Sequence, residues 1–173
     1  MIKIRQEVPC DYAEVYELVK KSFATSSYSD GTEQDYLNEL RKKDTFIQEL
    51  SLVSENDEGK LIGQIVLYKM KIVSAEKEFV ELVLSPICVH PDYFRRGIAR
   101  ALMEKAFEIA KNMDFKAVFL CGDPSFYRKI GFKPTFEYNI FHIDDKLRNA
   151  EYCMAHELID GALRDISGTI DIE

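Results

Sequence analysis

The chain has 173 residues, with no tryptophan, few cysteines and no apolar run near the ~18 residues that span a bilayer. Its four cysteines (Cys10, Cys88, Cys121 and Cys153) form no Cys-x-x-Cys pair, and no histidine stands at zinc-ligand spacing from them. We therefore expect no metal site, no membrane association, and reduced, mostly buried cysteines. Residues Ile2–Glu7 alternate apolar and polar, which predicts a strand rather than a signal peptide and hence a cytoplasmic protein.

Positive charge is also scarce. The chain has 23 Lys and Arg against 30 Asp and Glu, a formal net charge of −7. Because phosphate backbones require a positive field, we expect no nucleic-acid partner. Neither GxxxxGK[ST] nor GxGxxG after a strand occurs, which argues against a nucleotide-phosphate site. The length and a hydrophobic content of 46% indicate one globular domain over residues 1–173.

The order of the predicted elements indicates an α+β (mixed α/β) chain. Strands are expected at Ile2–Glu7, Glu49–Ser54, Leu61–Val73, Phe79–Val89, Lys116–Cys121, Phe132–Tyr138 and Glu151–Leu158. Helices are expected from Asp11 to Phe23, after Thr32, over Ile98–Met113 and over Pro124–Lys129. This order predicts a central mixed, mostly antiparallel sheet of about six to seven strands, flanked by about four helices. Pro86 cannot donate to a ladder, so a bulge or splayed edge is expected at Ser85-Pro86.

The most informative segment joins the strand that ends at Val89 to the helix that begins near Ile98. Residues 95–99 would present successive backbone N–H groups at a helix start, where free donors and the helix dipole favour an anion. Gly97 permits close backbone approach, and Arg95, Arg96 and Arg100 add positive charge. A diphosphate suits such a site. The same features also describe an ordinary basic helix start, and this pattern alone leaves both interpretations open.

Two motifs distinguish the interpretations. Val89-x-Pro91-x-Tyr93-x-x-Arg96-Gly97-Ile98-Ala99 resembles the pyrophosphate-binding motif of the GNAT superfamily of acetyl-CoA-dependent N-acetyltransferases. Further along, Phe126-Tyr127-Arg128-Lys129-Ile130-Gly131-Phe132 resembles the second signature of that superfamily. Two motifs in the expected order are more specific than either alone. The resemblance implies a GNAT-like fold with acetyl-CoA as the cofactor.

The resemblance covers nearly the whole chain. Residues 29–33, 122–127 and 154–161 are similar to a subgroup of bacterial and archaeal N-acetyltransferases with a Gly-Asp-Pro-x-aromatic-Tyr motif. The chain departs from the family at Phe94, where the phosphate motif usually begins with Gln or Arg. It departs again at Leu120, where the family often has an Asn that helps to hold the pantetheine arm.

The resemblance also implies which residues contact the cofactor. Backbone N–H groups near Cys88 and Val89 would stabilise the oxyanion that forms during acyl transfer. The full set of implied cofactor-binding residues is Ile87, Cys88, Val89, Phe94, Arg95, Arg96, Gly97, Ile98, Ala99, Arg100 and Tyr127.

Acyl transfer to an amine requires a base for the amine and an acid for the leaving thiolate. The resemblance implies that Tyr127 is the general acid, although on residue type alone it would be a core or cofactor-packing aromatic. Glu81, on the strand leading to the cofactor, is the candidate base and would otherwise be a solvated edge residue. Asp30 and Glu33 are candidates to bind or deprotonate the acceptor, or else turn and helix-start carboxylates. Asp123 is expected to cap the short helix before Tyr127.

The predicted function is direct transfer of an acetyl group from acetyl-CoA to a primary amine of a small molecule or peptide. The alternative is a non-catalytic acyl-CoA-binding or regulatory domain with the same fold. The presence of Tyr127 favours catalysis, whereas the lack of an evident base keeps the alternative open. The acceptor would be selected by loops at residues 24–33 and 134–150. The family commonly forms dimers, so a homodimer is one expected assembly.

Overall fold

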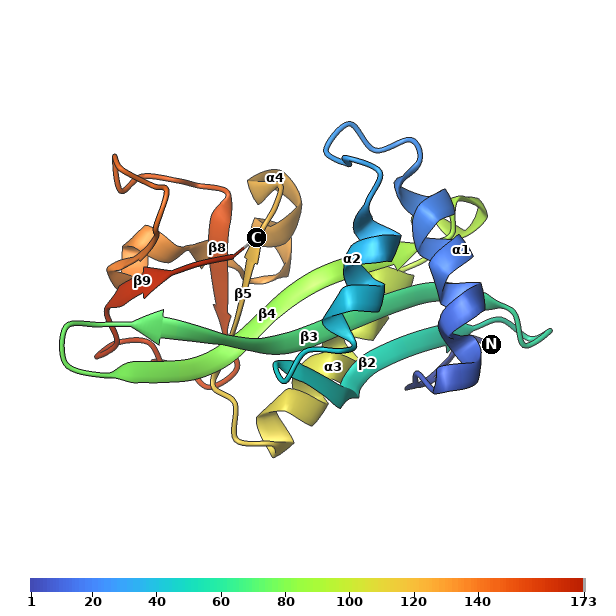
Figure 1. The fold of residues 1–173 in the computed structure, drawn as a ribbon, viewed down its shortest axis with the longest axis horizontal. Coiled ribbons are helices and arrows are strands. Elements are labelled where there is room, and N and C mark those ends of the chain that lie inside the picture. Colours follow the sequence, from blue (N-terminus) through green and yellow to red (C-terminus); the bar gives the residue numbers. More distant parts are fainter. Residues whose placement is uncertain (173) are drawn as a thin grey trace. The chain divides into compact units, whose positions relative to one another are not determined.

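The structure, a computed structural model, describes residues 1–172, which divide into two compact units (Figure 1). Unit 1 comprises Met1–Leu67 and Ser85–Ile109, and unit 2 comprises Tyr68–Leu84 and residues 110–172. Two long strands therefore contribute one part to each unit. The single domain expected over residues 1–173 stays a prediction.

The sheet of unit 1 contains β1 (Lys3–Gln6), β2 (Phe46–Glu55), the first part of β3 (Leu61–Val73) and the last part of β4 (Glu78–Val89), in that order. β1 and β2 are antiparallel, with Lys3 opposite Glu55. The turn between β2 and β3 is closed by the Asn56 N–H, which donates to the Lys60 carbonyl at 3.0 Å. At the predicted irregularity within β4, the Ser85–Pro86 peptide bond is cis.

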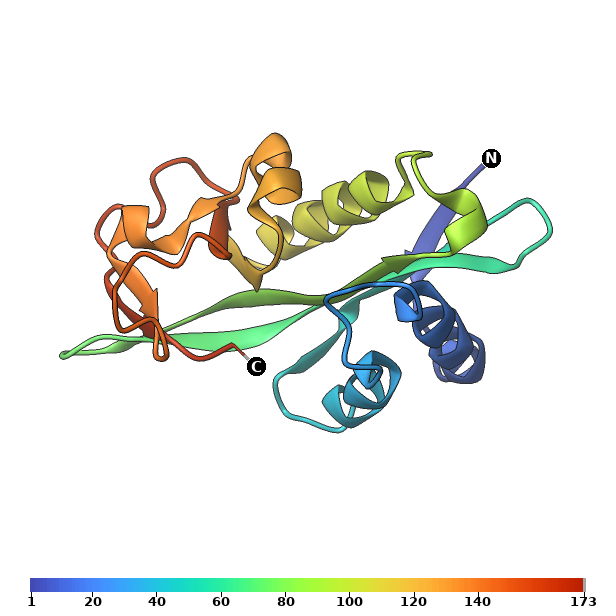
Figure 2. The same ribbon diagram turned by 90° about the horizontal axis from the view of Figure 1, so that it is seen from above.

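Three helices cover this sheet. After the 3-10 helix η1 (Pro9–Asp11), α1 (Tyr12–Phe23) and α2 (Glu33–Leu40) lie on one face of the sheet, and α3 (Ile98–Asn112) lies on the opposite face (Figure 2). The sequence favours these helices because apolar residues recur at helical spacing and become buried. The buried positions are Val15, Leu18 and Val19 in α1, Leu37 and Leu40 in α2, and Ile98, Leu102, Met103 and Ala106 in α3.

Gly63 of β3 lets α3 pack closely on the sheet. A Cβ atom at Gly63 would lie 2.6 Å from the Ser54 hydroxyl oxygen and 3.0 Å from side-chain carbons of both Ile98 and Leu102. Real Cβ contacts are essentially never that short, so a side chain at this position would push the helix outward. The first turns of α3 are therefore held firmly against β3, which positions the loop that precedes the helix.

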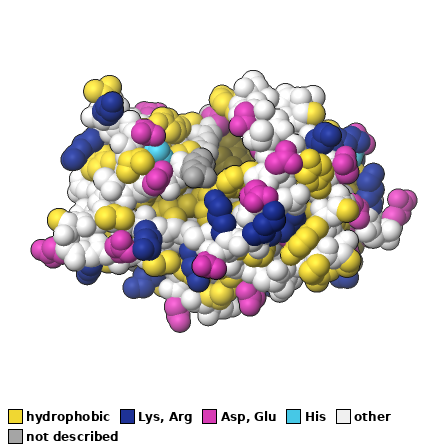
Figure 3. Space-filling view, in the orientation of Figure 1, with side chains coloured by type: hydrophobic (Ala, Val, Ile, Leu, Met, Phe, Trp, Pro, Cys, Tyr) yellow, Lys and Arg dark blue, Asp and Glu magenta, His cyan; other side chains and the backbone are white. Residues whose placement is uncertain are grey.

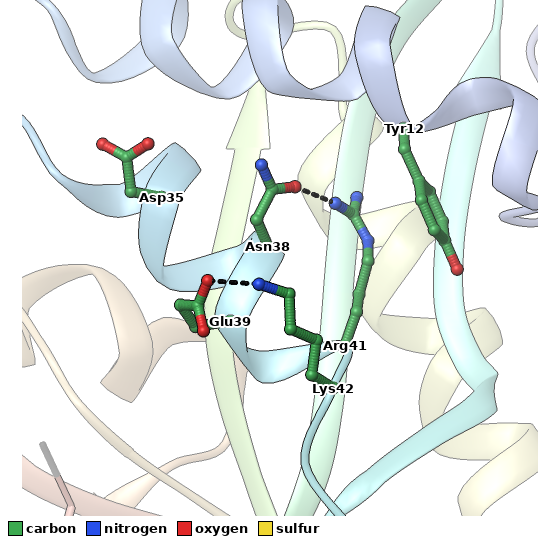
Figure 4. Close-up of a pocket in the computed structure, with 6 residues that line it drawn as sticks. All are labelled: Tyr12, Asp35, Asn38, Glu39, Arg41 and Lys42. Atoms are coloured by element: carbon green, nitrogen blue, oxygen red, sulfur yellow. Dashed lines mark hydrogen bonds and ion pairs between the residues drawn. The ribbon is translucent and has the colours of Figure 1, made fainter.

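A buried ion pair holds the end of α2 against the sheet. Glu7 is fully buried, forms an ion pair with Arg41 and accepts a hydrogen bond from the Ser51 hydroxyl at 2.7 Å. Arg41 also donates to Asn38 at 2.7 Å, and its guanidinium lies 4.0 Å from the centroid of the Tyr12 ring. Figure 4 shows Arg41 with Asn38 and Tyr12 in a pocket of about 410 Å³. Both charges are thus partnered, as buried charges must be.

Unit 2 combines the remaining parts of β3 and β4 with five shorter strands: β5 (Ala117–Cys121), β6 (Lys133–Pro134), β7 (Ile140–His142), β8 (Cys153–Glu157) and β9 (Gly168–Ile170). β5 runs parallel to β4, with Leu82 opposite Val118, and antiparallel to β8. β6 pairs antiparallel with β8, β7 pairs parallel with β9, and β9 pairs antiparallel with β3 at Val73 and Thr169. The sheet is therefore mixed and mostly antiparallel, as predicted.

The connections of unit 2 include one prediction that was wrong. The strand expected over Phe132–Tyr138 is reduced to β6, because Pro134 has no N–H for a longer ladder and the 3-10 helix η4 (Thr135–Tyr138) follows at once. The short helix is present as α4 (Pro124–Tyr127) and the 3-10 helix η3 (Arg128–Ile130). Strands β7 and β9 were not expected, so residues 1–172 contain nine strands rather than six to seven.

Some classes of site can be checked over the described residues. Within residues 1–172, no helix combines the length and apolar character that crossing a membrane requires, and no group of three or more His, Cys, Asp or Glu could hold a metal ion. On the face drawn in Figure 3, cationic and anionic side chains are interspersed and hydrophobic side chains also reach the surface.

Candidate active site

The loop between β4 and α3 has an unusual backbone that follows from its sequence. After β4 ends at Val89, the 3-10 helix η2 (Pro91–Tyr93) forms, and the His90 ring accepts a hydrogen bond from the Asp92 N–H at 3.2 Å. Arg95 (φ +61°) and Gly97 (φ +76°) then adopt left-handed conformations on either side of Arg96. Backbone conformations that alternate in hand aim successive N–H groups to one side, which is how anion-binding concavities form.

The backbone donors of this loop are free. Among residues 1–172, no backbone acceptor is found for the N–H groups of Arg95, Arg96, Gly97 and Ile98. The first N–H groups of α3 also lack partners, as at any helix start. No atom outside the neighbouring residues comes within 4 Å of the position that a Gly97 Cβ would occupy, so the loop is open at its centre. These residues fit a diphosphate: free donors, a helix N-terminus and exposed arginines converge on one loop.

Tyr93 connects the loop to neighbouring segments through three side-chain contacts. The Arg96 guanidinium lies 4.9 Å from the centroid of the Tyr93 ring, close enough for a cation–π contact. The Tyr93 hydroxyl accepts a hydrogen bond from the Asn56 side chain at 3.1 Å, and the His90 ring meets the Tyr93 ring edge-on. The conformation of the loop is therefore tied to the turn between β2 and β3. The sequence did not indicate the contact of Asn56 with Tyr93, because the two residues lie far apart in the chain.

The end of β4 offers a neutral thiol rather than a nucleophile. Ile87 and Val89 are half-buried, whereas Cys88 and His90 between and after them are buried. Burial raises the pKa of the Cys88 thiol to about 12, so this thiol stays protonated near neutral pH. Desolvation likewise lowers the pKa of His90, which keeps that ring neutral. Neither side chain is suited to forming a covalent intermediate.

The two departures from the family pattern have different surroundings. Phe94 is half exposed (52%) in the loop, where the family usually has a polar side chain. Leu120 is buried (1%) in β5 as part of the core of unit 2. Phe94 therefore leaves the backbone donors untouched, since they belong to residues 95–98.

A second concavity of unit 1 contains both predicted acceptor-binding carboxylates. It has a volume of about 380 Å³, and its lining residues are Lys20, Phe23, Ala24, Ser26, Ser29, Asp30, Gly31, Glu33 and Gln34. The Oε2 atom of Glu33 is buried without a hydrogen-bond partner. Asp30 accepts from the Thr32 hydroxyl at 2.6 Å and from the Thr32 N–H at 2.9 Å, and these bonds lower its pKa. The pocket thus holds two carboxylates, and one oxygen of Glu33 has no hydrogen-bond partner among the described residues.

Tyr127 lies at the end of α4 in unit 2. Its ring packs edge-on against Phe126 (5.0 Å between centroids) and Phe132 (5.4 Å), and it presses on the backbone of Gly122, where a Cβ would lie 2.6 Å from the ring. Burial, followed by the charge of Asp123, raises its pKa to about 12. No hydrogen-bond partner for its hydroxyl is found among residues 1–172. Tyr127 is therefore a protonated, available donor.

Asp123 and Glu81 have partners that the sequence suggested only in part. The Asp123 carboxylate accepts from the Ser125 N–H at 2.9 Å, which confirms its expected role as a helix cap. Glu81 is buried, and its Oε2 accepts from the N–H groups of Lys116 (2.9 Å) and Ala117 (3.2 Å) at the start of β5. Desolvation raises the pKa of Glu81, while these hydrogen bonds oppose the shift. Glu81 therefore joins β4 to the start of β5 through one carboxylate oxygen, independently of any role as a base.

Comparison with known proteins places this geometry in a family. A model of the acetyltransferase (GNAT) domain family matches residues 3–135. The chain belongs to the GNAT acetyltransferase family. This membership confirms the family and the enzyme class, an acyltransferase, that the two motifs implied.

The relatives of this GNAT chain support the same assignment. A curated protein described as the uncharacterized N-acetyltransferase YhbS of Escherichia coli K12 is 26% identical over 168 residues, covering 97% of this chain and 94% of YhbS. A crystal structure of E. coli YhbS in complex with CoA has a TM-score of 0.86 at 22% identity, covering 99% of this chain and 89% of that one. A GNAT acetyltransferase from Brucella melitensis in complex with acetyl-CoA has a TM-score of 0.78 at 24% identity, covering 100% and 96%. The predicted GNAT fold is thereby confirmed.

Proposed function

We propose that this protein transfers an acetyl group from acetyl-CoA directly to a primary amine of a small molecule or peptide. The observation that carries the proposal is the loop of residues 95–98 in this GNAT-family chain, whose N–H groups find no backbone acceptor within the described residues 1–172. Two solved relatives hold CoA and acetyl-CoA, which supports acetyl-CoA as the ligand of this loop.

In this proposal, each cofactor contact has a physical role. The N–H groups of Arg95–Ala99, including that of Ile98, and the charges of Arg95, Arg96 and Arg100 bind the diphosphate, while Ile87 and Phe94 provide apolar contacts. Bound acetyl-CoA supplies the acetyl thioester. Backbone N–H groups at Cys88 and Val89 stabilise the oxygen that gains charge during transfer.

The acceptor is a cationic amine bound at the pocket of residues 20–34. A buried carboxylate oxygen without a partner, as on Glu33, is costly unless a ligand donor or water satisfies it. The hydrogen bonds from Thr32 lower the pKa of Asp30, which favours its ionised form, so Asp30 adds a second negative charge. The volume of about 380 Å³ falls within the range of small-molecule sites.

Proton transfer is assigned to two residues. Tyr127 keeps its proton near neutral pH and donates it to the leaving thiolate. Glu81 is the proposed base, because desolvation raises the pKa of its carboxyl toward the range useful for catalysis. One observation favours the alternative of a non-catalytic acyl-CoA-binding domain: both hydrogen bonds of Glu81 go to backbone N–H groups, a purely structural use. We also propose, from the family resemblance, that the protein acts as a homodimer in the cytoplasm.

Titration calorimetry with acetyl-CoA, and with ATP as the control ligand, tests the proposal. We expect saturable binding of acetyl-CoA but not of ATP, followed by release of free thiol with at least one member of a panel of amines. Binding without thiol release for any amine would favour the non-catalytic domain. No binding of acetyl-CoA at sub-millimolar concentration would refute the proposal.

A further inference from the structure

Two cysteines of unit 2 face each other at the ends of neighbouring strands. Cys121 is the last residue of β5 and Cys153 the first of β8, and the two residues are directly opposite in the antiparallel pair. Their sulfur atoms lie 3.2 Å apart. Cys121 is exposed and Cys153 is buried, and all four cysteines of the chain are free. No sequence pattern indicates this pair, because 31 residues separate the two positions.

The hydrogen bonds of the ladder show which kind of pair this is. The Gly122 N–H donates to the Tyr152 carbonyl at 2.9 Å, and the Leu158 N–H donates to the Lys116 carbonyl at 2.7 Å. Hydrogen-bonded and non-hydrogen-bonded pairs alternate along an antiparallel ladder, so Cys121 and Cys153 form a non-hydrogen-bonded pair. In such pairs the Cα atoms are about 4.5 Å apart, which lies within the span that a disulfide tolerates.

The two thiols differ in reactivity. The hydrogen bond from Cys153 lowers the pKa of Cys121, whereas the same contact and burial raise the pKa of Cys153. Thiolates are the nucleophiles in disulfide exchange, and Cys121 is also the accessible member of the pair. Cys121 is therefore the residue that meets an oxidant first, with Cys153 placed to resolve the product.

We propose that Cys121 and Cys153 are a redox-responsive thiol pair that closes to a cross-strand disulfide in the presence of a small-molecule disulfide and thereby regulates the site at Tyr127. The Cys121 thiolate attacks one sulfur of the small disulfide RSSR, forming a mixed disulfide and releasing one thiol, RSH. Cys153 loses its proton and attacks the Cys121 sulfur, forming the protein disulfide and releasing the second RSH. The two protein thiols are oxidised and the small disulfide is reduced.

The link to Tyr127 runs through Gly122. Gly122 follows Cys121, and the Tyr127 ring lies so close to it that a Cβ atom would be 2.6 Å from the ring. Closing the sulfur separation from 3.2 Å to a bond draws the sulfur atoms together by roughly 1.2 Å. Movement of the Cys121–Gly122 backbone therefore shifts the surface on which Tyr127 rests. The effect on turnover rests on the proposed function, whereas disulfide formation does not.

Intact mass spectrometry of the full-length protein, first reduced and then exposed to oxidised glutathione, tests the chemistry. We expect the wild type to lose two hydrogen atoms, with tryptic peptides 117–128 and 149–164 linked. The matched control Cys10→Ser, which removes the other exposed cysteine, should behave in the same way. Cys153→Ser should stop at one glutathione on Cys121, and Cys121→Ser should form no such link. Persistent adducts without the linked peptides, or links through Cys10 or Cys88, would overturn the proposal.

The coupling between the Cys121–Cys153 disulfide and Tyr127 can be measured in two independent ways. Oxidation should lower acetyl transfer roughly tenfold to hundredfold, because misplacement of a catalytic group by about 1 Å can have that effect. Reductant should restore the rate of acetyl transfer. In Cys153→Ser, treatment with oxidised glutathione should lower that rate no further than the glutathione adduct on Cys121 itself does. The NMR resonance of isotope-labelled Tyr127, assigned with Tyr127→Phe, should also shift on oxidation. If the reduced protein has no turnover, the proposed function fails while the resonance still tests the coupling. An unchanged Tyr127 resonance in the disulfide form would refute the proposed coupling.

Discussion

Replacing Tyr127 by Phe removes one hydroxyl group and leaves the packing of the ring in place. The ring keeps its contacts with Phe126, Phe132 and Gly122. The hydroxyl has no hydrogen-bond partner among residues 1–172, so no protein hydrogen bond, worth about 1 kcal/mol, is lost. The unfolding midpoint of the variant should therefore match that of the wild type. A change in rate then reports on chemistry.

The expected size of that change follows from the protonation state of Tyr127. Because burial raises the pKa to about 12, Tyr127 remains neutral at pH 8 and all of the enzyme carries the proton. Loss of a positioned general acid lowers the rate by about 10²- to 10⁴-fold, which corresponds to roughly 3–5 kcal/mol in the barrier. The raised pKa also fixes the sign of the pH dependence. The proton is held as pH rises and is lost only near pH 12, so no alkaline limb from Tyr127 should appear below pH 10.

Release of free thiol, followed at saturating acetyl-CoA over a range of acceptor concentrations, separates kcat from KM. We expect the loss in Tyr127→Phe to fall on kcat, with the calorimetric affinity for acetyl-CoA unchanged. A kcat within about threefold of the wild type would show that Tyr127 is a packing residue rather than the acid. Weakened acetyl-CoA binding at an unchanged kcat would refute the reasoning in the same way.

Three further variants test the other assignments. Glu81→Gln keeps an oxygen that can accept hydrogen bonds from the Lys116 and Ala117 N–H groups. If Glu81 is the base, kcat measured by thiol release should fall by about 10²-fold or more. If Glu81 is only structural, kcat should stay nearly unchanged. Glu33→Gln should raise KM for cationic amines roughly tenfold to hundredfold in the same assay, since hydrogen bonds to charged groups contribute about 1.5–3 kcal/mol, while acetyl-CoA affinity stays constant. Arg41→Met leaves Glu7 buried and unpaired and should lower the free energy of unfolding in urea by about 3–5 kcal/mol, against little change for the exposed control Lys42→Met.

The sequence predicted those parts of the fold that have a long periodic pattern. The helix expected over Ile98–Met113 is α3 (Ile98–Asn112), and the strand expected over Phe79–Val89 is β4 (Glu78–Val89), each within one residue. Strands β7 and β9 have three residues each, too few for alternation to be visible, and they are held by pairing with distant segments. Local pattern cannot report such pairing.

The candidate site, too, could be predicted from the sequence only in part. The motifs singled out the loop of residues 95–98 and Tyr127 as candidates, because GNAT sequences mark these positions locally, and their roles stay a prediction. The left-handed backbone of Arg95 could not be predicted, since arginine has no preference for positive φ. Likewise, nothing near Cys121 in the sequence indicates Cys153, because only the register of β5 and β8 brings them together.

The hydrogen bond from Asn56 to Tyr93 bears on where this protein can be altered by engineering. Exposed hairpin tips usually accept inserted peptides without harm. At residues 56–60, however, an insertion would displace the Asn56 amide that donates to Tyr93, and Tyr93 in turn contacts Arg96 in the loop before α3. The hairpin between β3 and β4 is closed by hydrogen bonds between Ser74 and Lys77, and residues 75–76 take no part in those bonds. Tags and reporter segments should therefore be inserted at residues 75–76 rather than in the turn between β2 and β3.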